Sequence, residues 1–109
     1  MIMIKRGHNI ELNKETIYDV FNLLKTQVFG FQEIWKRDPS MGTETIYFEQ
    51  PIQINIGQLF ITITSGKNIV IYLKEGDIVK YHSSDTIYVW KKCTSGIFRF
   101  YKIKGKHKK

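Results

Sequence analysis

The sequence predicts an α+β fold, in which one N-terminal helix at about residues 14–29 precedes a meander of about seven short antiparallel strands. Apolar residues recur at helical spacing before Gly30, and from Thr43 onward they alternate with polar residues at a period of two. Turn-forming residues interrupt this alternation about every ten residues, as is typical of antiparallel proteins. Strands in this number are expected to form a strongly bent sheet or a small barrel.

The predicted helix has a start signal, an apolar stripe and a stop signal. Asn13 is placed to be the N-cap, because its side chain can accept a hydrogen bond from a free N–H of the first turn. Gly30 is placed to end the helix. The stripe between them is wide enough to lie against an apolar surface, and it consists of Ile17, Val20, Phe21, Leu24 and Val28.

The strand region begins with an ambiguous segment. Residues 31–37 are compatible with a short strand or with a second helical piece, and residues 38–42 predict a turn. The alternation then becomes regular, as in Ile52, Ile54 and Ile56. Gly, Ser, Asp and Asn residues separate the predicted strands, with breaks near 57, 65–68, 75–77, 83–85 and 93–96.

Length and composition indicate a single domain at residues 1–103, followed by a flexible basic tail at residues 104–109. The one cysteine, Cys93, cannot form an internal disulfide, which favours a reducing compartment. No signal peptide is recognisable, and no apolar run approaches the ~20 residues of a membrane span. We therefore expect the protein in a bacterial host cytosol, without a membrane partner.

The amino-acid usage indicates an AT-rich genome. The chain has 17 Ile and 14 Lys and no Ala, and AT-rich codons favour Ile and Lys over Ala. A low-GC bacterium, or a phage or mobile element that lives in one, is the predicted source.

The positive charge is concentrated at the C-terminal end. Of the net charge of +7, residues 90–109 contribute +8 and residues 1–89 contribute −1. Such an end creates a long-range field that attracts phosphate-rich partners.

The last two predicted strands carry the most informative pattern. A hairpin around residues 93–96 is expected to place Val89 opposite Phe100 and Trp90 opposite Arg99, which gives one aromatic and basic face. Such a face can stack bases and contact phosphates. In the alternative interpretation these rings pack under the helix, and another turn length would shift the register by one residue. The candidate binding residues are Tyr88, Trp90, Lys92, Arg99 and Tyr101 on the hairpin and Lys104, Lys106, Lys108 and Lys109 in the tail.

These features favour a non-enzymatic module that binds nucleic acid, RNA or DNA, or a nucleoprotein complex. By analogy with anti-CRISPR proteins, a phage protein of this size could inhibit a host nucleic-acid machine, although size and source alone do not establish function. No sequence motif indicates a cofactor or a metal site, and none is predicted.

Two other functions remain open. A metal-independent endoribonuclease toxin would need a general base, a general acid and a cation for the phosphate, and His82, Lys80 and Arg99 are the candidates. A structural or assembly protein would act through protein contacts, including contacts in a homo-oligomer.

Overall fold

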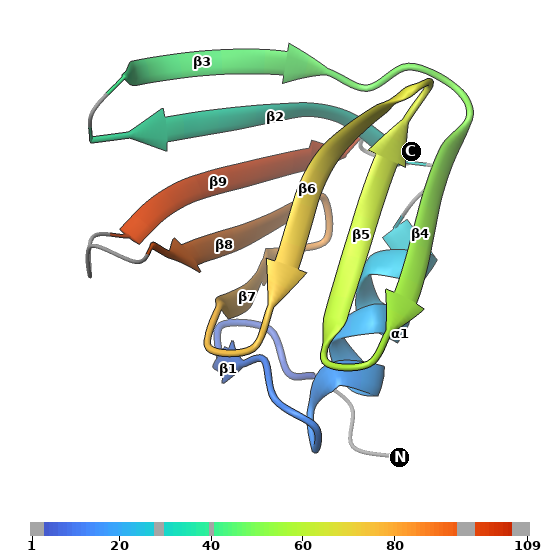
Figure 1. Ribbon diagram of the computed structural model, residues 1–109, viewed down its shortest axis with the longest axis vertical. Helices are drawn as coiled ribbons and strands as arrows, with labels where there is room; N and C mark the ends of the chain where they lie inside the picture. The colour runs from blue at the N-terminus through green and yellow to red at the C-terminus, as the bar shows by residue number, and fades with distance from the viewer. Residues whose placement is uncertain (1–3, 28–29, 40, 94–97, 106–109) are drawn as a thin grey trace.

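A computed structural model describes residues 4–27, 30–39, 41–93 and 98–105 of the chain (Figure 1). The fold is mainly β: of the described residues, 59% lie in strands and 13% are helical, and the two sheets that they form do not close into a barrel. The predicted α+β class is therefore wrong. The reason is that the helix is shorter than predicted and that the chain before residue 43 adds strands on both sides of it.

The described residues form one helix and nine strands. Helix α1 spans Ile17–Gln27. The strands are β1 (Asn9–Glu11), β2 (Phe31–Asp38), β3 (Gly42–Tyr47), β4 (Ile52–Gly57), β5 (Phe60–Ser65), β6 (Asn68–Lys74), β7 (Ile78–Ser83), β8 (Thr86–Lys92) and β9 (Phe98–Gly105). The ambiguous segment 31–37 is thus strand, and the strands from Ile52 onward lie where the alternation predicts them.

The strands form two antiparallel sheets. Sheet A has six strands in the order β1-β7-β8-β9-β2-β3, and sheet B has three in the order β4-β5-β6. Only parts of this arrangement are a meander, because the β2–β3 hairpin pairs with β9 and the short β1 pairs with β7. The predicted single meander is wrong on this point, since a period of two identifies strands but not their partners.

Helix α1 begins as its capping signal predicts. The Asn13 Oδ1 atom accepts hydrogen bonds from the backbone N–H groups of Glu15 at 2.8 Å and Thr16 at 3.0 Å. Residues 14–16 form a turn, which is why the helix starts at Ile17 and not at residue 14. None of the helices in the described ranges has the length and apolar character that crossing a bilayer requires.

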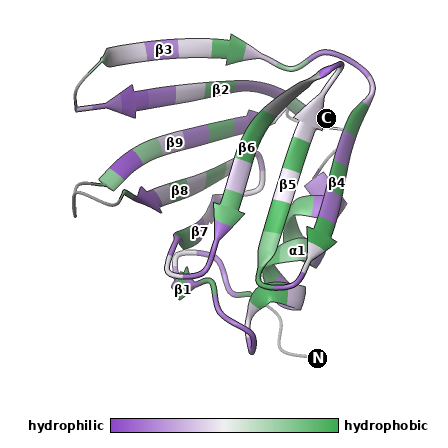
Figure 2. Ribbon diagram, in the orientation of Figure 1, coloured by the Kyte–Doolittle hydropathy of each residue, from purple (hydrophilic) through white to green (hydrophobic). Residues whose placement is uncertain are grey.

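The core lies between sheet A, sheet B and α1. The helix lies against β4 and β5, and its buried residues are Ile17, Val20 and Leu24. Figure 2 shows apolar segments gathered on α1 and sheet B, while β2 and β9 alternate between hydrophilic and apolar positions. One cluster of buried side chains joins the three layers, so only one face of sheet A is used for the core.

Two glycines allow tight turns at the ends of sheet A strands. Gly42, with a φ of 80°, closes the predicted turn between β2 and β3. Gly76, with a φ of 94°, stands between β6 and β7, directly before Asp77. Both φ values lie in the left-handed region, which costs a residue with a side chain much more than it costs glycine.

Candidate functional site

The hairpin of β8 and β9 has a different register from the predicted one. Val89 lies opposite Tyr101, and Trp90 lies opposite Phe100. The predicted pairs are therefore wrong by one residue, and in a strand such a shift moves every side chain to the other face. The prediction depended on a turn at residues 93–96, and of these residues 94–96 lie outside the described part of the chain.

Sheet A consequently has two faces of distinct character. We call the face toward α1 and sheet B the inner face, where Ile34, Val79, Ile87, Val89 and Ile103 are buried. The opposite face is the outer face. The side chains that β8 presents to the outer face are Tyr88, Trp90 and Lys92, and those that β9 presents are Phe98, Phe100 and Lys102. The other two β9 residues considered above, Arg99 and Tyr101, point to the inner face.

Five rings pack against one another on the outer face, and we call them the ring cluster. The Phe100 ring centroid lies 5.3 Å from that of Tyr88 and 5.5 Å from that of Trp90. Trp35 lies 6.0 Å from Phe100, and His82 stacks on Tyr88 at 4.4 Å. The members, Trp35, His82, Tyr88, Trp90 and Phe100, come from β2, β7, β8 and β9.

Basic residues stand among these rings. Along one row across the sheet, Lys80 lies opposite Tyr88, Tyr88 opposite Lys102, and Lys102 opposite Trp35. Directly opposite side chains in such a sheet are about 5 Å apart, so cations and rings alternate within contact distance. The outer-face cations are Arg37, Lys80, Lys92, Lys102 and Lys104.

Most of these cations have no acidic partner among the residues that the structure describes. Lys104 Nζ lies 3.7 Å from Glu33 Oε1, and within the described ranges the other four outer-face cations form no ion pair. The outer face is therefore positively charged at neutral pH and aromatic at its centre.

The inner face carries a row of charges that is internally paired. Lys91 Nζ donates to Asp77 Oδ2 at 2.5 Å, and the Asp77 carboxylate also accepts the backbone N–H groups of Lys74 and Lys92, both at 2.9 Å. Next in the row, Arg99 Nη2 lies 2.7 Å from Asp38 Oδ2. Both carboxylates are buried, Asp77 completely, so each inner cation of β8 and β9 is neutralised locally.

Arg99 and Tyr101 form part of this inner row. The hydrogen bond with Tyr101 raises the pKa of the Arg99 guanidinium, and the nearby Asp38 carboxylate acts in the same direction. Burial raises the pKa of the Tyr101 hydroxyl, and the hydrogen bond from Arg99 opposes that rise in part. These two predicted binding residues thus point to the inner face, where Tyr101 is buried and Arg99 is half-buried.

The residues proposed for ribonuclease chemistry are not brought together. His82 stacks on the outer face and Lys80 points to the same side, but Arg99 forms an ion pair with Asp38 on the inner face. No cluster of three or more His, Cys, Asp or Glu that could hold a metal ion occurs in the described part of the chain.

The structure describes only the first part of the predicted basic tail at residues 104–109. Lys104 is paired in β9, opposite Thr86 and Glu33, and so belongs to the sheet. Lys106, Lys108 and Lys109 lie outside the described residues.

Sequence reasoning missed several outer-face residues. Trp35 and Arg37 alternate with Ile34 and Lys36, a signal that would have placed them on one face if residues 31–37 had been assigned to a strand. Phe100 and Lys102 were placed on the wrong face by the register error.

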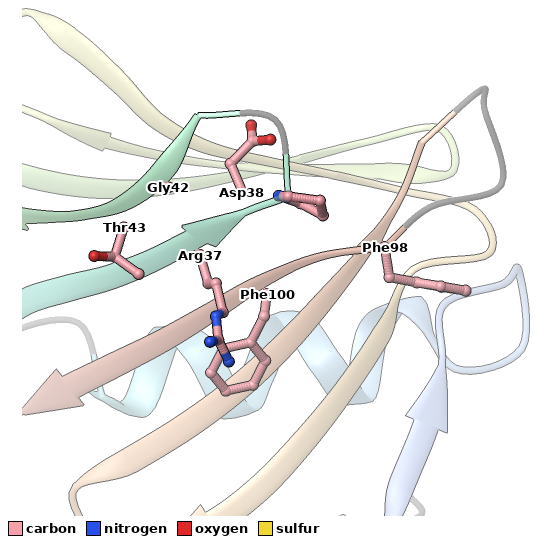
Figure 3. Close-up of a pocket in the computed structure, with 7 residues that line it drawn as sticks. Arg37, Asp38, Gly42, Thr43, Phe98 and Phe100 are labelled. Carbon is pink, nitrogen blue, oxygen red and sulfur yellow. The ribbon is translucent and has the colours of Figure 1, made fainter.

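Two hollows open on the outer face beside the ring cluster, one on each side of Phe98. The first has a volume of about 210 Å³ and is lined by Asn9, Ile78, Trp90 and Phe98. The second has a volume of about 470 Å³, and Arg37, Thr43, Phe98 and Phe100 are among its lining residues (Figure 3).

Comparison with known proteins finds no matching family model, no matching curated protein and no matching solved structure.

Proposed function

We propose that this protein binds single-stranded nucleic acid on the outer face of sheet A. The observation that carries the proposal is the row Lys80–Tyr88–Lys102–Trp35, in which cations and rings alternate across neighbouring strands. A base that stacks on an aromatic ring contributes ~1–3 kcal/mol, and any base can do so. Lysines beside the rings supply contacts to the phosphates that connect the bases.

The burial pattern supports a binding surface. The core cluster joins α1 and sheet B to the inner face of sheet A, while Trp35, Tyr88, Trp90 and Phe100 on the other side stay partly exposed. Sheet-based RNA-binding domains present rings in this way, on an open face of an antiparallel sheet. Single strands suit this surface better than duplexes, because pairing hides the faces of the bases.

The charge pattern favours nucleic acid over a protein partner. Interfaces between proteins are depleted of lysine at their centres. Here Lys80 and Lys102 flank Tyr88 in the middle of the face, and neither forms an ion pair with a described acidic residue. A cytosolic site of action, where single-stranded nucleic acid is accessible, and the role of a phage inhibitor are part of this proposal.

Intrinsic fluorescence offers a direct test, because both tryptophans of the chain, Trp35 and Trp90, belong to the ring cluster. We expect a short oligothymidylate and a short oligouridylate to quench this fluorescence. The affinity should fall as salt rises, with a slope of about −0.7 per phosphate contact in a plot of log affinity against log salt. A duplex of equal length should bind more weakly.

Two single-tryptophan variants, Trp35→Phe and Trp90→Phe, serve as controls, since each should retain part of the quenching. If no single strand binds in a salt-dependent manner, the proposal is wrong. Sedimentation of the same sample would then show whether the face is covered by a second copy of the chain.

A further inference from the structure

We propose that the two hollows beside Phe98 hold two adjacent bases of the bound strand, with the Phe98 ring between them. This inference rests on the proposed function and adds a base-dependent site to a surface that would otherwise bind only through charge and general stacking. Three features support a base-dependent site: the exposure of Phe98, the lining of the hollows and the cations next to them.

Phe98 differs from the other outer-face aromatic residues of β8 and β9, which belong to the ring cluster. Its side chain is 41% exposed, and no ring of the described residues stacks against it. The same ring lines both hollows. Because the Phe98 ring is exposed to water, it lacks the stabilisation that burial gives to the rings of the ring cluster. A base stacked on either side of Phe98 would bury its apolar surface.

The first hollow combines an apolar surface with one amide. Trp90 lies opposite Ile78 on adjacent strands, and both line the hollow together with Phe98. Asn9 lines it from β1, at the edge of the sheet. An asparagine amide both donates and accepts hydrogen bonds, so it can pair with the polar edge of a base whose faces contact the rings.

The second hollow has a ring and a cation side by side. Arg37 lies opposite Phe100 in the β2–β9 pairing, and Figure 3 shows its guanidinium beside the Phe100 ring. Thr43 lies opposite Arg37 on β3 and adds a hydroxyl group. Asp38 also lines this hollow, but its carboxylate is paired with Arg99, which offsets its negative charge.

Two cations are placed for the phosphates of the same strand. Lys92 lies opposite Phe98 and is exposed, so its ammonium group can reach the phosphate that links the two bases. Arg37 is exposed at the second hollow, and none of the described acidic residues forms an ion pair with it. A strand that places successive bases on either side of Phe98 would therefore meet one cation at each step.

The test compares a short oligothymidylate with an oligomer of abasic sugar-phosphates of the same length and charge. The wild-type protein should bind the oligothymidylate between about fivefold and a hundredfold more tightly. Phe98→Ala should reduce that ratio at least fivefold, whereas Lys92→Gln should weaken both ligands and leave the ratio unchanged. Tyr18→Ala is the matched control, because Tyr18 is 67% exposed on α1 and away from sheet A.

Phe98→Leu, which keeps an apolar side chain but cannot stack, should behave as Phe98→Ala does, and circular dichroism should show both variants folded. Equal binding of the two oligomers by the wild type would overturn this inference, as would a ratio that Phe98→Ala and Phe98→Leu leave unchanged. Either result is compatible with the proposed function. Absence of salt-dependent binding to both oligomers would contradict the proposed function itself.

Discussion

The two faces of sheet A are built from the same strands but treat their charges in opposite ways. On the inner face, Lys91 and Arg99 each meet a buried carboxylate, at 2.5 Å from Asp77 and 2.7 Å from Asp38. On the outer face, the described cations have a single ion pair, that of Lys104 with Glu33 at 3.7 Å. The inner cations of β8 and β9 are therefore neutralised by buried carboxylates, whereas among the described outer cations only Lys104 forms an ion pair.

The paired charges of the inner face are required for folding, whereas the unpaired cations of the outer face are not. The buried carboxylates of Asp77 and Asp38 need a cationic partner, because an unpaired buried charge costs several kcal/mol. The outer cations are solvated and need none, yet their mutual repulsion lowers stability slightly. Lys80 and Lys102, which flank Tyr88 in one row, therefore contribute nothing evident to the fold, and a polyanionic ligand would account for both.

Removing the Asp77 carboxylate should have the largest effect. In Asp77→Asn, Lys91 loses its counter-ion. The new amide N–H group also faces a backbone N–H group that donates to the carboxylate in the wild type, so two donors oppose each other. We expect the free energy of unfolding to fall by about 3–5 kcal/mol, as measured by urea denaturation.

Glu33→Gln is the matched control on the outer face, because it removes a carboxylate whose partner Lys104 is 45% exposed. We expect a loss below about 1 kcal/mol for this variant. Similar losses for the two substitutions would show that the contrast between the faces is not energetic.

A smaller effect, on binding and not on stability, is expected for the double variant Lys80→Gln/Lys102→Gln. Two fewer phosphate contacts should make the salt dependence of oligothymidylate binding shallower by about 1.4, at about 0.7 per contact. The free energy of unfolding should stay within about 0.5 kcal/mol of the wild-type value, as for most surface substitutions.

Lys14→Gln/Lys25→Gln is the control, since it removes the same charge from two exposed residues at and near α1. It lowers the net charge equally but should leave the slope unchanged. If both double variants change the slope alike, the binding depends on net charge and the outer face has no special role.

The contrast between the faces was only partly predictable from the sequence. The strand positions from Ile52 onward follow from alternation and turn residues, and Asn13 follows from capping chemistry. These are local signals, so one sequence is enough to find them. Tyr88, Trp90 and Lys92 share the outer face for the same reason, because they alternate along a single strand.

The remaining features depend on pairing, which no local signal specifies. One residue of register decides whether Arg99 points to the outer face or to Asp38, and no local signal in residues 93–96 fixes the turn length on which the predicted register depends. The place of β2 beside β9 joins residues about seventy positions apart, so the contribution of Trp35 to the ring cluster could not be foreseen. The buried pairing of Lys91 with Asp77 has the same origin.

The smallest expected effect concerns Tyr101, which tests whether the inner row stays closed to solvent. Burial raises its pKa above the ordinary value of about 10. A group with a raised folded-state pKa contributes stability that is complete below its unfolded pKa and is lost as the pH rises through the folded one. Between pH 8 and about 11, the wild type should therefore lose more stability than Tyr101→Phe, which cannot ionise at this position.

At neutral pH the Tyr101→Phe variant should be less stable than the wild type by only about 0.5–1.5 kcal/mol, because it lacks the hydrogen bond with Arg99. Phenolate absorbance during an alkaline titration measures the ionisation, and Tyr18→Phe, which removes an exposed tyrosine, is the control. A Tyr101 hydroxyl that ionises at the ordinary value of about 10 would mean that water reaches the inner row, and the two faces would then differ in sequence but not in environment.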